Sequence, residues 1–251
     1  TAYQIHLFHQ QLQSDIVQLK KSTELLKKKN NSLKDFFQRE SSKLTSNIAK
    51  LFNSTQVELN NYAASFADTN YENKNVGKTW KEDSVVTNKT SYLNEQIKTS
   101  LNRFNGEVKE RIEEISSDIK FIDKISSTVS AQTDSIHNTK SGVRIVGTIC
   151  TIIFTNLWNP LSWGALIGSA IIAGVIRFFT SFFESKVEKI KKAKKKLREQ
   201  LYENIEKNIN TNKKETLDKI HSSISLMNNR LKNLLGTYID EVEQLIRILE
   251  D

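Results

Sequence analysis

The amino-acid sequence predicts an all-α fold: an elongated antiparallel bundle of very long helices with an apolar helical hairpin. Three observations lead to this prediction. The 251 residues include only 8 Gly and 1 Pro, so residues that interrupt helices are scarce. Apolar residues recur at steps of three, four and seven, whereas the alternation typical of strands is absent. Only 37% of the residues are hydrophobic, which suits a slim bundle better than a thick globular core.

The first long helix is expected over residues 1–66. Its apolar stripe has a heptad spacing, carried by Ile5, Leu12, Leu19, Leu26 and Leu33. The next step is eleven residues, to Leu44, and is followed by seven to Leu51. A long helix absorbs such a stutter by local unwinding. The basic and polar residues 27–31 leave a hinge or turn open as an alternative.

Polar residues 67–83 have no apolar period and are expected to form a loop. Part of this stretch, "ENKNVGKT", is reminiscent of a phosphate-binding loop, but Glu72 stands where that loop needs Gly, and no strand precedes it. A second amphipathic helix is expected next, with an apolar face of Leu93, Ile97, Leu101, Phe104, Val108, Ile112, Ile115, Ile119, Ile122, Val129 and Ile136.

A third long periodic region begins at Lys186. Its expected face comprises Val187, Ile190, Leu197, Leu201, Ile205, Ile209, Leu217, Ile220, Ile224, Met227, Leu231 and Leu234, with Val242, Leu245 and Leu249 continuing it. Gly236 is expected to end or kink this helix. The sequence therefore divides into a bundle segment at 1–140, an apolar hairpin at 141–185 and a basic long helix with a return helix at 186–251.

The apolar hairpin has no charged side chain from Ile145 until Arg177. Pro160 favours a turn between two limbs of sixteen residues. Each limb would be about 24 Å long as a helix, whereas a hydrocarbon core is about 30 Å thick. We therefore expect a hairpin that dips into one leaflet. The residues expected to insert are Ile145, Ile149, Ile152, Ile153, Phe154, Leu157, Trp158, Pro160, Leu161, Trp163, Leu166, Ile167, Ile171, Ile172 and Val175. A hairpin buried in a soluble core is the alternative.

A dense basic run follows the hairpin. It contains Lys186, Lys189, Lys191, Lys192, Lys194, Lys195, Lys196 and Arg198, with Glu188 as its one acid. These thirteen residues carry +7 of a net charge of +8, so the rest of the chain is close to neutral. The run is expected to bind anionic lipid, because each Lys or Arg near an anionic leaflet contributes about 1 kcal/mol. No aromatic residue interleaves and no reader motif is present, which argues against a nucleic-acid partner.

No catalytic residue, cofactor site or metal site is predicted in this chain. A single cysteine, Cys150, excludes an internal disulfide. His6 and His9 are three residues apart, as metal ligands can be, but no Cys or acidic residue joins them before Asp15. We interpret them as residues at the edge of the apolar stripe.

The order of these elements, with "ESKVEKIKKAKKKLREQLYENIEKNI" after a Gly- and Ala-rich apolar hairpin, resembles the helical stalk of bacterial dynamin-like proteins. The resemblance covers the whole chain in layout and is specific only over residues 143–209. It implies a cytoplasmic, peripheral membrane protein that forms homo-oligomers and remodels anionic bilayers. It also implies an upstream GTPase head, with GTP and Mg in the parent protein. Because the chain begins with Thr1 and its one Met is Met227, we expect a piece of a longer chain or a processed form.

Two other functional classes are consistent with the same pattern. Helical pore-forming toxins of the haemolysin type also carry an apolar hairpin between long helices. The polybasic run favours the dynamin-like interpretation over the toxin. A coiled-coil scaffold could instead use the hairpin for protein–protein association.

Overall fold

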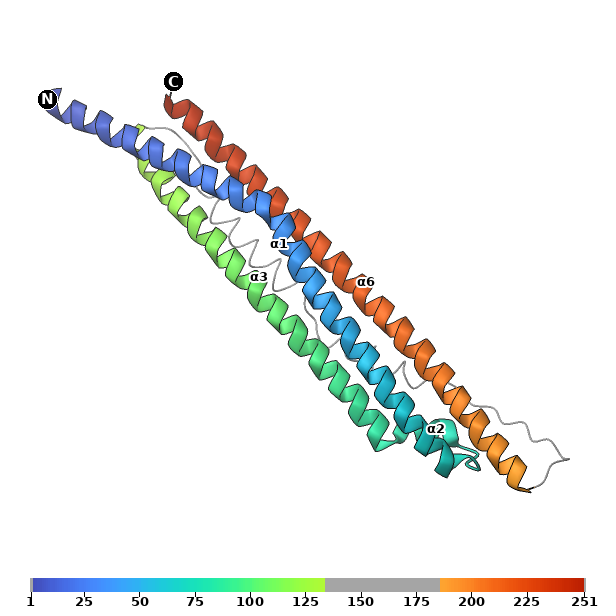
Figure 1. Ribbon diagram of the computed structural model, residues 1–251. Coiled ribbons are helices and arrows are strands. Elements are labelled where there is room, and N and C mark those ends of the chain that lie inside the picture. Colours follow the sequence, from blue (N-terminus) through green and yellow to red (C-terminus); the bar gives the residue numbers. More distant parts are fainter. Residues whose placement is uncertain (1, 134–185, 251) are drawn as a thin grey trace. The chain divides into compact units, whose positions relative to one another are not determined.

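The computed structural model describes residues 2–133 and 186–250. Within these residues there are four helices and no strand, which confirms the predicted all-α class (Figure 1). The helices are α1 (Ala2–Asn70), α2 (Val76–Glu82), α3 (Ser84–Thr133) and α6 (Lys186–Glu250). Three of them are far longer than an average helix, with 69 residues in α1, 50 in α3 and 65 in α6.

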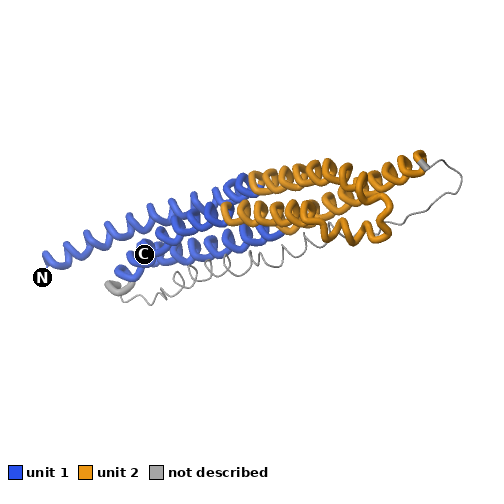
Figure 2. The backbone as a smooth tube through the Cα atoms, turned by 90° about the horizontal axis from the view of Figure 1, so that it is seen from below, with its two compact units in different colours: residues 1–41, 104–158, 222–251 blue, residues 42–103, 159–221 orange. Residues whose placement is uncertain are grey.

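The chain forms two compact units (Figure 2). In its described residues the first unit comprises 2–41, 104–133 and 222–250, and the second comprises 42–103 and 186–221. Each unit therefore combines parts of α1, α3 and α6. The second unit also contains α2.

In the first unit, α1 is antiparallel to both α3 and α6. The Lys29 ammonium pairs with Asp118 at 2.7 Å, and Arg111 donates a 2.7 Å hydrogen bond to the Ser32 hydroxyl. The residue numbers of the contacts therefore decrease along α3 as they increase along α1, as in antiparallel helices. Ion pairs to α6 show the same direction, joining Lys20 to Glu250 and Lys27 to Glu243. It follows that α3 and α6 run parallel to each other in this unit.

The core of the first unit follows the predicted heptad stripe. Leu19, Leu26 and Leu33 of α1 are fully buried, as are Ile115, Ile122 and Val129 of α3, which are also seven apart. The stripe does not stay buried over its whole length. Ile5, which was expected in the core, is 60% exposed.

Elsewhere the buried positions recur every eleven residues. In α1 of the second unit the pairs Ile48–Leu59 and Phe52–Ala63 show this step, and in α6 of the first unit Ile224–Leu235–Ile246 does. Eleven residues over three turns give 3.67 per turn, close to the 3.6 of a straight helix, so the stripe stays on one face. The expected core positions Leu51, Leu217 and Leu234 were therefore wrong: Phe52, Thr216 and Leu235 are buried in their place.

The stretch 67–83, predicted to be a loop, is mostly helical. Helix α1 continues to Asn70, and α2 follows after a short turn. Trp80 holds α2 in place, because its indole is 5% exposed and packs edge-on against Phe66 with ring centroids 4.9 Å apart. A helix of seven residues is too short to show an apolar period, so the sequence pattern did not reveal it.

Asp83 joins α2 to α3. Its Oδ1 accepts hydrogen bonds from the amides of Val85 and Val86 at 2.9 and 3.3 Å, which satisfies two of the free amides at the start of α3. Its Oδ2 accepts a 2.8 Å hydrogen bond from the Tyr62 hydroxyl. Asp83 therefore fixes the corner between the two helices against α1.

Two expected interruptions are absent from the described helices. Residues 27–31 lie inside α1, where Lys29 pairs with Asp118 and Lys27 with Glu243, so the hinge alternative was wrong. Gly236 lies inside α6 and does not end it. A Cβ atom at this glycine would meet nothing within 4 Å, so the site does not require the absence of a side chain.

Candidate anionic-lipid site at the start of α6

All of the residues predicted to insert into a bilayer, from Ile145 to Val175, lie outside the described residues. Among the described helices, none combines the length and the apolar character that a membrane crossing requires. The part of the predicted membrane site that the structure does describe is the basic run, residues 186–198, which we name the basic segment.

The basic segment is the first part of α6. Leu197 and Leu201 are buried, so the side of α6 that carries them faces the core of the second unit. The lysines lie on the remaining sides in two rows with helical spacing: Lys189, Lys192 and Lys196 form one row, and Lys191 and Lys195 belong to the other. All five of these side chains are exposed. Of Lys186, only its position at the start of α6 is described.

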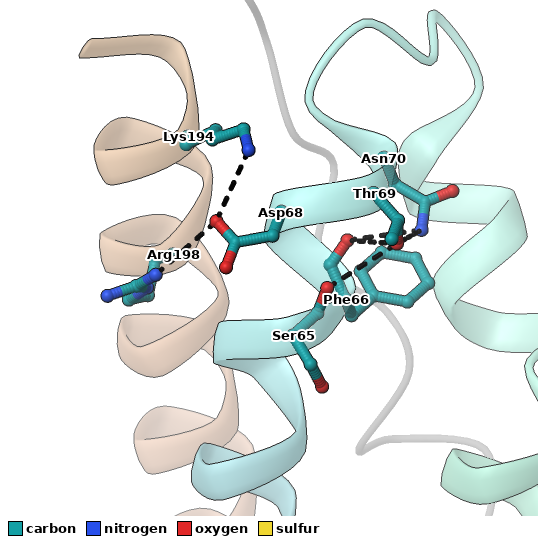
Figure 3. Close-up of polar contacts among 7 residues, drawn as sticks. All are labelled: Ser65, Phe66, Asp68, Thr69, Asn70, Lys194 and Arg198. Carbon is teal, nitrogen blue, oxygen red and sulfur yellow. Dashed lines mark hydrogen bonds and ion pairs between the residues drawn. The ribbon is translucent and has the colours of Figure 1, made fainter. Parts of the chain in front are cut away.

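Asp68, near the end of α1, holds the other two cations (Figure 3). One carboxylate oxygen, Oδ1, lies 3.7 Å from the Lys194 ammonium and 3.6 Å from the Arg198 guanidinium. The Lys194 ammonium also lies 5.2 Å from the centroid of the Tyr71 ring. Lys194 and Arg198, both predicted to bind anionic lipid, therefore already have an anion from α1, and Lys195 lies 3.8 Å from the carboxylate of Glu199 on its own helix.

The end of α1 is built to place Asp68 against α6. Phe66 is 3% exposed, and its backbone carbonyl accepts 3.1 Å hydrogen bonds from the side chains of Thr69 and Asn70 (Figure 3). These two side-chain hydrogen bonds close the last turn of α1. The closed turn orients Asp68 toward Lys194 and Arg198, as Figure 3 shows.

The charge of the basic segment is unfavourable for the helix that carries it. A helix N-terminus has a partial positive charge, so cations in the first turns lower helix stability and anions raise it. The first turn of α6 holds one acidic residue, Glu188. Asp68 is half exposed and offsets the local charge only in part. The basic segment therefore keeps a net positive charge that its own chain does not neutralise.

Sequence analysis did not identify Asp68 or Tyr71 as members of this site. Neither belongs to a motif, and both lie more than a hundred residues before the basic segment. The signal that locates them is the antiparallel register of α1 and α6. In the second unit Lys213 donates to Asn53 at 3.1 Å, and extending that register by four helical turns brings Asp68 to Arg198.

The other candidate chemistry does not assemble into a site. The side chain of His6 forms a hydrogen bond with Gln10, and His9 packs edge-on against Phe8. Across residues 2–133 and 186–250, no group of three or more His, Cys, Asp or Glu side chains could hold a metal ion. In the stretch that resembled a phosphate-binding loop, the Asn73 side chain donates to Thr79 and accepts from the Asn75 amide.

These features define a class of protein only at the level of an all-α helical bundle with a basic helix start. Comparison with models of protein families, with curated proteins and with solved structures gave no match. The function is therefore argued from the residues themselves.

Proposed function

We propose that this chain is the membrane-binding, self-associating helical stalk of a dynamin-like membrane-remodelling GTPase. In this proposal the apolar hairpin inserts into an anionic bilayer and the basic segment binds its headgroups. The observation that carries the proposal is the exposure of Lys189, Lys191, Lys192, Lys195 and Lys196 directly after an uncharged apolar block.

The energies of insertion and of charge attraction favour a joint role for the apolar hairpin and the basic segment. As a helix, each apolar limb of sixteen residues would be shorter than the hydrocarbon thickness, so insertion by the hairpin alone would be weak. Each lysine near an anionic leaflet contributes about 1 kcal/mol, and five exposed lysines would make shallow insertion firm. Their position at a helix start, where cations cost stability, also favours a role in binding over a role in folding.

The wider assignment rests on the resemblance in layout. In a dynamin-like protein the stalk binds lipid and other stalks, while a separate head binds GTP and Mg and hydrolyses the nucleotide. The peripheral, cytoplasmic location that the resemblance implies belongs to the same proposal. The residues of this chain would act by binding the bilayer and by associating with further copies.

The test is sedimentation of the chain with vesicles of neutral lipid and with vesicles that contain anionic lipid. We expect binding to anionic vesicles that weakens as salt is raised. The triple variant Lys189→Gln, Lys191→Gln and Lys195→Gln should bind on the order of a hundredfold more weakly, because it loses about 3 kcal/mol of attraction.

A matched control is available on the same helix. The variant Lys207→Gln, Lys214→Gln and Lys219→Gln removes three exposed charges from the second unit outside the basic segment. Equal weakening by the two triple variants, or equal binding of the chain to neutral and anionic vesicles, would contradict the proposed lipid site. Leakage of dye from the vesicles without nucleotide would favour the toxin class instead.

A further inference from the structure

Two cations of the basic segment converge on one point beside the end of α1 (Figure 3). Lys194 and Arg198 are four residues apart on α6, so their side chains are neighbours, and both approach the same atom, Oδ1 of Asp68. Tyr71 flanks this point, because the Lys194 ammonium lies 5.2 Å from the centroid of its ring. We name Lys194 and Arg198, with Tyr71 beside them, the anion site.

The carboxylate of Asp68 fits the anion site poorly. Its Oδ1 lies 3.7 Å from the Lys194 ammonium and 3.6 Å from Nη2 of Arg198. A charge-assisted hydrogen bond between nitrogen and oxygen is about 2.7–2.9 Å long, so both distances are too long for a direct bond. Asp68 therefore offsets part of the charge of the two cations without forming a short hydrogen bond with either.

Arg198 also carries a donor without a partner. Its Nε atom is buried and forms no hydrogen bond with any residue that the structure describes. In a guanidinium, Nε and Nη2 share one edge and can donate two parallel hydrogen bonds to two oxygens of one anion. A buried donor without a partner costs free energy. The edge of Arg198 therefore favours an anion that reaches both nitrogen atoms.

The donors of the anion site select among anions. A phosphate monoester has three terminal oxygens and a charge of about −1.5 to −2 at neutral pH, whereas a carboxylate has two oxygens and a single charge. Two of the three oxygens can accept hydrogen bonds from Nε and Nη2 of Arg198, and the third can accept from Lys194. A phosphodiester has only two free oxygens and a single charge, so it cannot complete this set.

We propose that Lys194 and Arg198 bind a phosphate monoester, which displaces the carboxylate of Asp68. Displacement is easy, because ion pairs between partly exposed side chains contribute little to stability. The monoester is the terminal phosphate of a lipid headgroup or a free phosphate monoester with the same chemistry. For the membrane source, the inference names the headgroup chemistry of the proposed lipid site and rests on the proposed function.

The first experiment compares vesicles that carry phosphatidic acid, a phosphate monoester, with vesicles of equal surface charge that carry phosphatidylglycerol, a phosphodiester. Sedimentation of the chain should show about tenfold tighter binding to phosphatidic acid, the effect of one additional charge-assisted hydrogen bond. Arg198→Lys keeps the charge but removes the edge with two donors, so this preference should disappear. The matched control Arg103→Lys makes the same exchange at an exposed site in the second unit and should keep the preference. Circular dichroism of both variants checks that helicity is retained.

A soluble phosphate monoester separates the two sources. In a titration of glycerol 3-phosphate followed by phosphorus NMR at constant ionic strength, we expect binding that Arg198→Lys weakens and Arg103→Lys does not. Such binding without a preference for phosphatidic acid would support the site with a free phosphate as its ligand.

Two results would overturn the inference. One is equal binding to both vesicle types together with no binding of glycerol 3-phosphate, and the other is a preference that Arg198→Lys leaves unchanged. Failure of the proposed lipid function is a different result, because the chain would then bind neither vesicle type, while the titration would still report on the anion site.

Discussion

The hydroxyl of Tyr238 on α6 donates a 2.7 Å hydrogen bond to Oδ1 of Asp123 on α3. Tyr238 is 1% exposed, and its hydroxyl also lies 3.3 Å from the carbonyl oxygen of Ile119. Burial, together with Asp123, raises the pKa of Tyr238 well above its usual range. This polar link lies within an apolar core, so its partners have to meet at one register of the two parallel helices.

The first prediction concerns this bond. Tyr238→Phe should lower the free energy of unfolding by about 1.5–3 kcal/mol, the usual contribution of a hydrogen bond to a charged group. Urea denaturation followed by circular dichroism measures the change. Tyr92→Phe is the control, because Tyr92 is 60% exposed and its replacement should alter stability by no more than about 0.5 kcal/mol. A similarly small effect at Tyr238 would show that the bond contributes nothing.

The second prediction concerns high pH. Burial and the hydrogen bond to Asp83 raise the pKa of Tyr62 to about 12, from an ordinary value of 10.0. The folded chain holds this proton more tightly than the unfolded chain, so the contribution of Tyr62 to stability is complete below pH 10 and is lost as the pH rises toward 12. The difference in unfolding free energy between the chain and its Tyr62→Phe variant should therefore shrink over this interval. A constant difference would disprove the linkage.

The third prediction concerns Gly236. Because this residue lies inside α6 and a Cβ atom would meet no neighbour, Gly236→Ala should raise the free energy of unfolding by about 0.5–1 kcal/mol. Urea denaturation provides the measurement. A loss of stability would indicate that the glycine permits a close approach that the structure does not show.

The fourth prediction concerns Asp68. Asp68→Asn removes the anion that holds Lys194 and Arg198, so binding to anionic vesicles should strengthen several-fold. The half-exposed ion pairs contribute little to folding, and stability should fall by less than about 1 kcal/mol. Vesicle sedimentation measures the change in binding, and urea denaturation measures the change in the free energy of unfolding. Glu215→Gln changes the net charge equally at an exposed site in the same unit and should leave binding nearly unchanged.

Much of the fold could be predicted because long amphipathic helices repeat their pattern many times. The heptad of Leu19, Leu26 and Leu33 identified buried residues directly. Errors occurred where a repeat was short or changed its period. Helix α2 has no period because it is one seven-residue segment held by Trp80, and the eleven-residue repeat moved the core from Leu51 to Phe52.

The candidate site was only partly predictable. The lysines of the basic segment are evident from composition, since nearly all of the net charge falls on thirteen residues. The sequence does not distinguish the cations that face solvent from Lys194 and Arg198, which Asp68 holds. That distinction depends on the register between helices distant in sequence, and no local pattern encodes it.

The sequence by itself therefore determined the all-α class, the long helices and the concentration of positive charge, because each depends on spacing and composition along one segment. Only the tertiary structure decided that α3 and α6 run parallel in the first unit, and that Asp68 lies against the start of α6. The tertiary structure also decided that the heptad stripe of α1 stays open at Ile5. These relationships follow from which helices share a core and at what register, a choice made by packing between segments and not within them.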